Sequence, residues 1–386
     1  MAAETVFRIV RKVAEIPAAE WDRLAGDRSP FLKWDWLDTL EQTGCAGPET
    51  GWVPHHLVIE RGGRAVGACP MYLKLHSMGE FVFDYEWAEA ARRCGIAYYP
   101  KLLIGVPMTP VTGPRLLTDP AEPRAPLLRL MGRALAKIAH DNRISSVHVN
   151  FCLEEESEAL ESAGFLPRLG IQFHWQNRNF SSFDDYLASF RSERRNKIKR
   201  ERREIAERGI TIRPVEGADL RPGLMRTMFR LYKAHIDRLY YGRQYLNREF
   251  FEEIGVRFSD HLCLMVAERG GKVIAGTFNV RDRTAMYGRY WGSFEDHPFL
   301  HFNVCYYSAI EHCIRSGLRR FEAGAGGSFK QLRGLDPEPT RSAHYFTDER
   351  FRGAVERYLE QERNLVREKR DVLLEHSQLK TGSNSK

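Results

Sequence analysis

Apolar positions along the chain follow an order of helices and strands that occurs twice. Residues 57–68 and 265–276 each contain two apolar stretches joined by an Arg-Gly-Gly turn. Because paired glycines supply the positive φ angles of a tight turn, both segments are predicted β-hairpins. They lie too far apart for a solenoid repeat and fit two copies of one domain. Chance similarity is the alternative, since Gly-Gly hairpins are common.

Helical periodicity supports the duplication. Residues 127–139 have an apolar helical face and precede a strand pattern at 146–151, and residues 304–314 precede a second one at 318–323. Further predicted helices, at 34–40 before the first hairpin and at 226–239 and 248–258 before the second, complete each copy. This order predicts an α+β fold with mixed, mainly antiparallel sheets flanked by helices.

The segments between and after the copies define the expected domains. Residues 183–209 place Leu187, Phe190, Ile198 and Ile205 on one side of a charged helix that Gly209 ends. A second charged helix follows Asp348. The predicted organisation is a first domain at 1–180, a second at 181–347 that begins with the basic helix, a charged helix at 348–376 and a flexible tail at 377–386.

Composition excludes several classes of protein. The chain has 386 residues, of which 43% are hydrophobic and 28% charged, as in ordinary globular proteins. No apolar run approaches the roughly 18 residues of a membrane span, and the first residues lack a secretion pattern. The seven cysteines are scattered and none forms a CxxC pair. We therefore expect reduced thiols, a cytoplasmic protein and no metal site.

The positive charge is concentrated in one segment. The net charge is +7, and residues 191–208 hold nine Lys or Arg against four Glu. Arg194, Arg195, Lys197 and Arg200 are therefore candidates to bind RNA phosphates or a pyrophosphate. The alternative is a solvated linker helix whose Glu and Arg side chains pair with each other.

The most informative motif is the glycine-rich stretch at residues 321–334. An apolar strand ends at Glu322, three glycines follow within five residues, and Phe329-Lys330 comes shortly after them. Glycines let the backbone approach a ligand, and Lys330 with free N–H groups suits an oxyanion. Glu322 is a candidate proton acceptor. The alternatives are a surface turn with solvated cations and a Glu322 that pairs with an arginine.

These motifs resemble those of the FemABX-type transferases, which are tandem GNAT folds. The matching strings are Arg194-Arg195-Asn196, Tyr290-Trp291-Gly292-Ser293, Pro298-Phe299-Leu300, Phe321-Glu322 and Phe329-Lys330. A FemAB-like group labelled as peptidoglycan-biosynthesis proteins is more similar still, through strings at 76–84, 98–102, 109–115, 172–175 and 287–292. The resemblance covers roughly residues 30–360.

The resemblance implies transfer of an aminoacyl group from aminoacyl-tRNA to an amine by direct attack, without a covalent enzyme intermediate. Lys330 takes the role of the family lysine that stabilises the oxyanion. No bound cofactor is implied beyond the aminoacyl-tRNA co-substrate. The chain departs from the family where Ser328-Phe329-Lys330 replaces acidic-His-Lys and where Arg333-Gly334-Leu335 follows.

Further candidates would bind the amine-bearing acceptor. An aromatic and charged group in the first domain could form its pocket, with Lys101 and Arg115 on an anionic group, and the second domain adds residues near the glycine motif. The predicted substrate-binding set is Asp84, Tyr99, Lys101, Arg115, His174, Tyr290, Trp291, His301 and Arg333. Two other functions compete with this one: an acyl-CoA-dependent N-acyltransferase, although no [Q/R]xxGx[G/A] loop is evident, and a non-catalytic module that binds RNA or a membrane surface.

Overall fold

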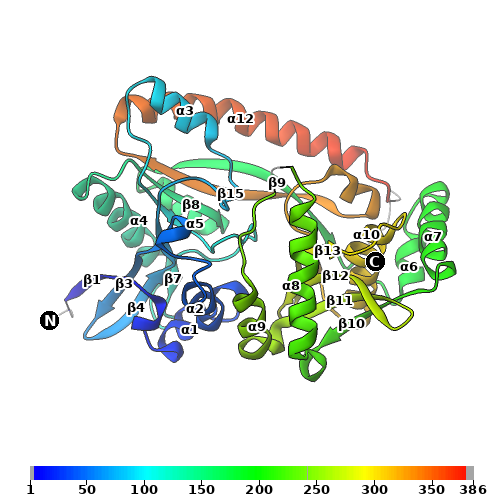
Figure 1. Cartoon of the computed structure of the whole chain (residues 1–386). Helices are drawn as coiled ribbons and strands as arrows, with labels where there is room; N and C mark the ends of the chain where they lie inside the picture. The colour runs from blue at the N-terminus through cyan, green and yellow to red at the C-terminus, as the bar shows by residue number, and fades with distance from the viewer. Residues whose placement is uncertain (1–3, 241, 380–386) are drawn as a thin grey trace. The chain divides into compact units, whose positions relative to one another are not determined.

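The chain forms two compact units, in a computed structural model that describes residues 4–240 and 242–379 (Figure 1). One unit comprises Met1–Gly170 and Pro339–Glu368, and the other comprises Ile171–Glu338 and Lys369–Lys386. Strands β9 (Leu166–Gln176) and β15 (Asp336–Phe346) and helix α12 (Glu349–Glu375) each contain a boundary between the units.

The first unit contains two groups of strands. The order β1-β3-β4-β7 is antiparallel throughout, and β15-β8-β6-β5-β2 contains one parallel pair, β6 with β8. The elements are β1 (Thr5–Val10), α1 (Ala18–Ala25), α2 (Trp34–Gln42), β2 (Trp52–Pro54), β3 (His56–Arg61), β4 (Arg64–Cys69), β5 (Met71–Lys74), α3 (Tyr85–Arg93), β6 (Lys101–Ile104), β7 (Leu117–Thr118), α4 (Arg124–Asp141), β8 (Ser146–Cys152) and α5 (Glu154–Glu161).

The second unit has one run of strands in the order β10-β11-β12-β13-β14-β9. Its elements are α6 (Phe183–Ala188), α7 (Ser192–Glu207), β10 (Ile210–Glu216), α8 (Pro222–Asp237), α9 (Arg248–Arg257), β11 (Leu262–Arg269), β12 (Lys272–Arg281), β13 (Ala285–Ser293), α10 (Leu300–Phe302), a π-turn (Asn303–Tyr307), α11 (Ser308–Arg315), β14 (Arg320–Glu322) and a 3-10 turn (Ser328–Arg333).

The two units share one sequence of elements. Each contains, in this order, a strand (β1 or β10), two helices and a hairpin, β3–β4 or β11–β12, whose Gly-Gly turn has positive φ at both glycines. Each continues with a strand, a helical segment and a strand parallel to the first: β6 and β8 across α4, and β13 and β14 across α10–α11. The predicted duplication and the mixed, mainly antiparallel sheets are therefore confirmed.

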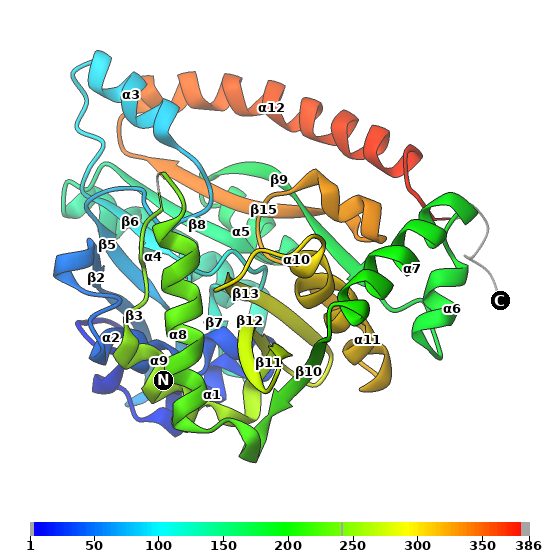
Figure 2. The same ribbon diagram turned by 45° about the vertical axis from the view of Figure 1, so that its right-hand side comes forward.

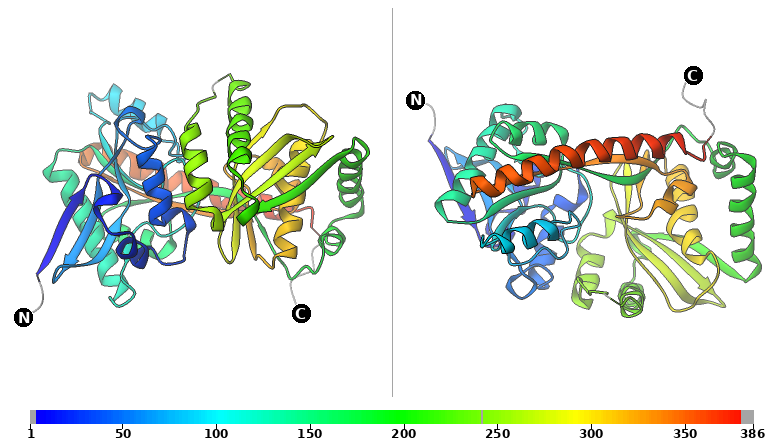
Figure 3. Two further views of the ribbon diagram at one scale, coloured as in Figure 1. Left: turned by 60° about the horizontal axis from the view of Figure 1, so that its bottom comes forward. Right: turned by 90° about the horizontal axis from the view of Figure 1, so that it is seen from above.

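Helices cover both faces of the strands in the second unit. Along β11, Cys263, Met265 and Ala267 belong to the core that also holds Ile310 and Cys313 of α11. Helix α8 packs against β12 and β13, and Figures 2 and 3 show α8 and α11 on opposite faces of these strands. The near-continuous burial of β11 and β12 follows from this arrangement.

The compact units differ from the predicted segments in two places. Residues 341–346 of β15 pair with β8, so this stretch, expected in the second domain, belongs to the first unit together with most of α12. The helix expected over 183–209 is divided into α6 and α7, because the chain turns at residues 189–191 to bury Phe190. Residues 380–386 of the expected tail lie outside the described residues.

Among the described residues, none of the helices combines the length and the apolar character that a transmembrane span requires.

Candidate active site

A pocket lies in the second unit where two parallel strands separate. The pairing of β13 with β14 covers only Ala285–Tyr287 and Arg320–Glu322. Immediately afterwards the register of β12 and β13 shifts, so that Arg289 is an extra residue between two paired positions. The pocket has a volume of about 90 Å³ and is lined by Thr277, Asn279, Gly288, Arg289, Tyr290, Trp291, His301, Cys305, Tyr306, Phe321 and Ala323.

Lys330 lies beside this pocket with a buried ammonium group. Its Nζ donates hydrogen bonds to the carbonyl oxygens of Gly324 (2.5 Å) and Ala325 (3.3 Å), which follow the pocket-lining Ala323. The side chain is only 2% exposed, and burial lowers its pKa to about 8. The preceding residue, Phe329, has its ring centroid 6.3 Å from that of His301 and 6.0 Å from that of Tyr306, so Lys330 directly follows a side chain that packs against the pocket wall.

Positive φ angles shape the loop that holds Lys330. Gly324, Gly326 and Gly327 have φ values of 77°, 72° and 84°, which residues other than glycine rarely adopt. The loop can therefore reverse after β14 and return Lys330 to the carbonyls at its start. This explains why the sequence places so many glycines before the lysine.

Three of the predicted substrate-binding residues line the pocket: Tyr290, Trp291 and His301. The His301 ring lies 5.1 Å from that of Trp291 and 5.6 Å from that of Tyr306, centroid to centroid, both in edge contacts. Burial, with the nearby Arg333, lowers the pKa of His301 to about 4. His301 is therefore neutral at pH 7 and can accept a hydrogen bond inside the pocket.

Sequence analysis missed several lining residues, of which Arg289 is the most notable. Its guanidinium is buried, and burial lowers its pKa from the usual value. The string Tyr287-Gly288-Arg289-Tyr290 contained a signal, because a glycine beside a charged residue inside an aromatic strand is typical of a bulge. Asn279, Cys305 and Tyr306 were also missed, since their neighbours in the pocket come from distant elements.

Glu322, predicted to be catalytic, points away from the pocket. Phe321 and Ala323 line the pocket, and side chains alternate along a strand, so Glu322 occupies the opposite face. Its Oε1 lies 2.9 Å from Nε of Arg320, and its Oε2 lies 3.6 Å from Nε2 of His174. The structure thus places the predicted His174 with Glu322 rather than with Tyr290, Trp291 and His301.

Burial is the largest influence on the pKa values of Glu322 and His174. It raises the pKa of Glu322 to about 7 and lowers the pKa of His174 to about 4. Among the described residues, Oε2 of Glu322 is buried without a hydrogen-bond partner. The pairing of Glu322 with Arg320 corresponds to the structural alternative that the sequence left open.

One of the four phosphate-binding candidates of the basic helix α7, Arg194, makes contacts inside the protein instead. Arg194 is buried, donates through Nε to the carbonyl oxygen of Leu332 (2.5 Å), and lies 4.0 Å from Glu201. It shares the inner helix face with Ile198 and Ile205, so it is not available to RNA. Arg195 is half-buried, whereas Lys197 and Arg200 are exposed.

Arg333 likewise has an internal role. Its guanidinium lies 3.4 Å from the centroid of the Phe302 ring, and NH1 donates to the carbonyl oxygen of Phe329 (2.9 Å). NH2 is 3.6 Å from Glu201, which also accepts from Tyr307. Arg333 therefore ties the 3-10 turn to α7 and does not line the pocket.

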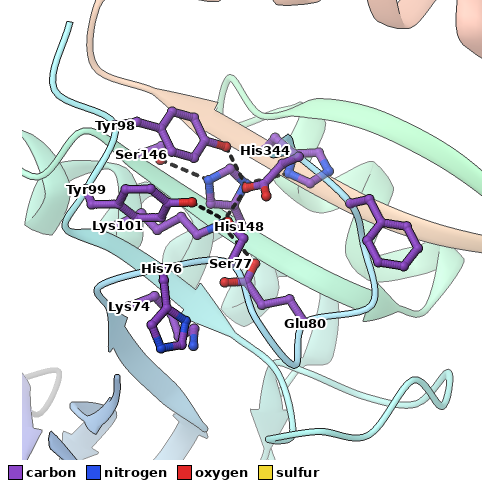
Figure 4. A network of polar contacts seen from close by, with 12 residues as sticks. Lys74, His76, Ser77, Glu80, Tyr98, Tyr99, Lys101, Ser146, His148 and His344 are labelled. Atoms are coloured by element: carbon purple, nitrogen blue, oxygen red, sulfur yellow. Dashed lines mark hydrogen bonds and ion pairs between the residues drawn. The ribbon is translucent and has the colours of Figure 1, made fainter. Parts of the chain in front are cut away.

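Lys101, Asp84 and Tyr99, predicted in the first domain, do meet in one hydrogen-bonded network of the first unit, of which Figure 4 labels Lys101 and Tyr99. Lys101 is fully buried and donates through Nζ to Ser77 (2.8 Å), to Glu80 (2.8 Å) and to Asp84. The hydroxyl groups of Ser77 and Tyr99 are 2.7 Å apart. Burial raises the pKa of Glu80 to about 7 despite the opposing effect of Lys101.

Arg115 is separate from that network and is 1% exposed. Its guanidinium donates to the carbonyl oxygens of Asn150 (2.8 Å), Pro114 (3.0 Å) and Val111 (2.5 Å). Arg115 therefore crosslinks loops of the first unit, and the structure does not bring it beside Lys101 on a shared anionic group as the sequence suggested.

The duplicated order of elements and the pocket at a diverging parallel pair give the chain a fold of two tandem GNAT-like units. The model of the FemAB-like family, described as peptidoglycan biosynthesis/recognition, matches residues 12–381. The chain belongs to this family.

Solved structures agree on the fold. FemX is 12% identical, with 92% of this chain and 100% of that chain covered and a TM-score of 0.53. The C-terminal domain (DUF2156) of a putative lysylphosphatidylglycerol synthetase from Agrobacterium fabrum is 12% identical, with 90% and 96% covered and a TM-score of 0.56. No curated protein matches the sequence significantly. Family and fold together support an acyltransferase.

Proposed function

We propose that the chain is an aminoacyltransferase that moves an aminoacyl group from aminoacyl-tRNA to an amine at the pocket beside Lys330. The observation that carries this proposal is the buried ammonium of Lys330 next to a small, aromatic-walled pocket. The chain is similar in fold to FemX, whose name is part of that of the FemABX-type transferases that the sequence motifs resemble.

The proposed step needs little from the protein beyond placement and charge. The amine nitrogen attacks the ester carbon, a C–N bond forms, and the bond to the ribose oxygen breaks as that oxygen gains the proton lost by the amine. Holding the two reactants together removes much of the barrier. The pocket volume of about 90 Å³ suits the reacting ester and a small side chain.

Lys330 would stabilise the oxyanion of the tetrahedral intermediate. An ammonium group has three N–H donors, and among the described residues two of them bond to Gly324 and Ala325. The third can donate to the oxyanion in a site where burial strengthens the interaction. With a pKa of about 8, Lys330 is mostly protonated at pH 7.

The donor would be held partly by the exposed cations of α7. Arg195, Lys197 and Arg200 remain on or near the surface of this helix, whereas Arg194 does not. Lys197 and Arg200 are three residues apart and share one side of the helix, and such neighbouring cations can neutralise phosphates along a backbone. We place the reaction in the cytoplasm, where aminoacyl-tRNA is available; no cofactor beyond this co-substrate is proposed.

The test is a donor comparison. The purified chain is incubated with mixed radiolabelled aminoacyl-tRNAs or with labelled acetyl-CoA, together with a pool of amines. Amide formed from aminoacyl-tRNA, and lost in Lys330→Met but not in Lys272→Met, supports the proposal; Lys272 is an exposed lysine of the same unit. Amide formed from acetyl-CoA alone would assign the acyl-CoA function instead. RNA binding without any transfer would assign a binding module.

A further inference from the structure

Three potential metal ligands meet in the second unit at a distance from the proposed reaction. Glu216 ends β10, Cys263 is the second residue of β11, and His312 lies in α11. One ligand atom of each, the carboxylate oxygen, the thiol sulfur and an imidazole nitrogen, lies within 4.8 Å of the other two. The sequence was expected to contain no metal site because it lacks a CxxC pair. That pattern cannot detect these three ligands, since they come from three separate elements.

Strand register explains why the three side chains converge. Glu216 is the direct cross-strand partner of Cys263 in the antiparallel β10–β11 pair. Directly opposite residues place their side chains on the same face of a sheet. Cys263 belongs to the core covered by α11, so this is the face from which His312 reaches down. Packing of α11 against β10 fixes the third ligand.

The distances fit a small tetrahedral ion after a modest adjustment. Nε2 of His312 is 3.4 Å from Oε1 of Glu216. In a tetrahedral zinc site with bonds of about 2.0–2.3 Å, neighbouring ligand atoms are about 3.3–3.8 Å apart. The His–Glu separation is already in this range, and side-chain rotation alone can bring the thiol closer.

We propose that Glu216, Cys263 and His312 form a binding site for Zn²⁺ or a similar borderline-soft divalent cation. The donor set carries the choice of metal, because thiolate and imidazole favour zinc over magnesium or calcium. Three protein ligands leave a fourth position for water or a small ligand. The half-exposed Glu216 gives the ion a route from solvent.

Binding would displace a proton and change one ion pair. Burial, with the neighbouring Glu216, raises the pKa of the Cys263 thiol, so the ion replaces the thiol proton, which leaves to solvent. Nε of Arg281 is 2.8 Å from Oε1 of Glu216 and would compete with the metal for that oxygen. The side chain of Arg281 is 34% exposed and can turn outward when a cation binds.

Cross-strand pairs connect the proposed metal site to the pocket. Cys263 is opposite Asn279, which is opposite the pocket-lining Gly288, and Asn279 itself lines the pocket. Nδ2 of Asn279 donates to the backbone carbonyl of Cys263 (2.8 Å). A bound ion would tie α11, and the π-turn before it, to β10 and β11.

Titration of the chelator-treated full chain with Co²⁺ tests the site. Thiolate ligation gives a near-ultraviolet charge-transfer band, which we expect to saturate at one ion per chain and to disappear on competition with Zn²⁺. We expect Cys263→Ser to abolish the band and His312→Gln to weaken binding at least about 100-fold. Cys94→Ser, which removes an exposed thiol, is the matched control and should keep both.

A second measurement separates lost ligation from lost folding. Zn²⁺ should raise the thermal midpoint of the wild-type chain and of Cys94→Ser, but not of Cys263→Ser or His312→Gln, while circular dichroism without metal shows each variant folded. No band, a band that survives in Cys263→Ser, or a band lost in Cys94→Ser would overturn the proposal. Since neither readout uses aminoacyl transfer, the proposed function is tested separately.

Discussion

The Nζ atom of Lys330 donates a 2.5 Å hydrogen bond to the carbonyl oxygen of Gly324, six residues before it in the chain. The lysine therefore holds the glycine-rich loop closed while its charge lies beside the pocket. Neutral carbonyl oxygens accept these bonds, and among the described residues no carboxylate forms an ion pair with Nζ. The positive charge is therefore available to the oxyanion of the proposed reaction.

Removal of this charge should greatly slow transfer. In Lys330→Met the aliphatic stem is retained and the ammonium is lost, and we expect kcat to fall roughly 100- to 1000-fold, as on removal of an oxyanion donor. Lys272→Met should be unchanged. Single-turnover rates with aminoacyl-tRNA measure the effect, and a Lys330→Met rate within threefold of wild type would contradict it.

The pH dependence should report the same ammonium. Its pKa is about 8, so Lys330 is protonated below that pH and neutral above it. We expect kcat/KM to fall above pH 8 by about tenfold per pH unit as the cation is lost. An arginine stays charged throughout this range.

Lys330→Arg should therefore lose the alkaline fall, even if its maximal rate is lower. Rates between pH 6 and 10 at subsaturating donor, which report kcat/KM, provide the measurement. An identical alkaline fall in wild type and Lys330→Arg would assign the titration to another group.

Glu322→Gln tests the assignment of the carboxyl to the opposite face of β14. Since Glu322 contacts Arg320 and His174 rather than the pocket, we expect transfer to fall less than about tenfold. A loss as large as in Lys330→Met, with the thermal midpoint preserved, would instead support the catalytic proton acceptor that the sequence suggested.

The half-buried Arg195 and the exposed Lys197 and Arg200 of α7 should set the salt dependence of tRNA binding. Replacement of Arg195, Lys197 and Arg200 by Ala should flatten the slope of log affinity against log salt by about 2 to 3, because each lost phosphate contact removes about 0.7 to 0.9. Filter binding between low and physiological salt measures the slope.

Helix α4 supplies the matched control for that experiment. Arg129, Arg133 and Lys137 are three exposed cations on one helix, and their replacement by Ala should leave the slope unchanged. Equal slopes for the α7 variant and the wild type would reject the assignment of α7 to tRNA.

Lys101→Met should destabilise the first unit. The substitution leaves the buried carboxylates of Glu80 and Asp84 without their cation, which costs about 3–5 kcal/mol. Denaturant unfolding measures the loss. The triple variant Lys101→Met, Glu80→Gln, Asp84→Asn removes all three charges and should recover much of it; no recovery would show that packing, not charge, is responsible.

Local patterns predicted most elements of the fold. The Gly-Gly turns at 62–63 and 270–271 and the apolar faces of α4 and α11 are encoded within short stretches, so periodicity was sufficient. The break between α6 and α7 was missed, because the apolar residues Leu187 and Phe190 fit a continuous helix equally well. Only tertiary burial of Phe190 decides between the two.

The candidate site was less predictable, because several of its charged side chains are buried inside the protein, where the sequence alone does not place them. Lys330 and the pocket-lining Tyr290, Trp291 and His301 were found from local motifs. Arg194, Arg333 and Arg115 were expected to face ligands, but each is buried against backbone carbonyls. The local sequence around an arginine does not show whether its side chain binds RNA or crosslinks loops. Only the folded structure distinguishes these two roles.

The positions of the unit boundaries within β9, β15 and α12 have a practical consequence. A fragment that ends near residue 180 lacks Arg341–Phe346, the strand partner of β8, and therefore leaves a hydrogen-bonding edge uncovered. A fragment that begins there carries that strand without β8. Truncated expression products of either half are thus expected to aggregate, and co-expression of complementary pieces is the better way to divide this enzyme.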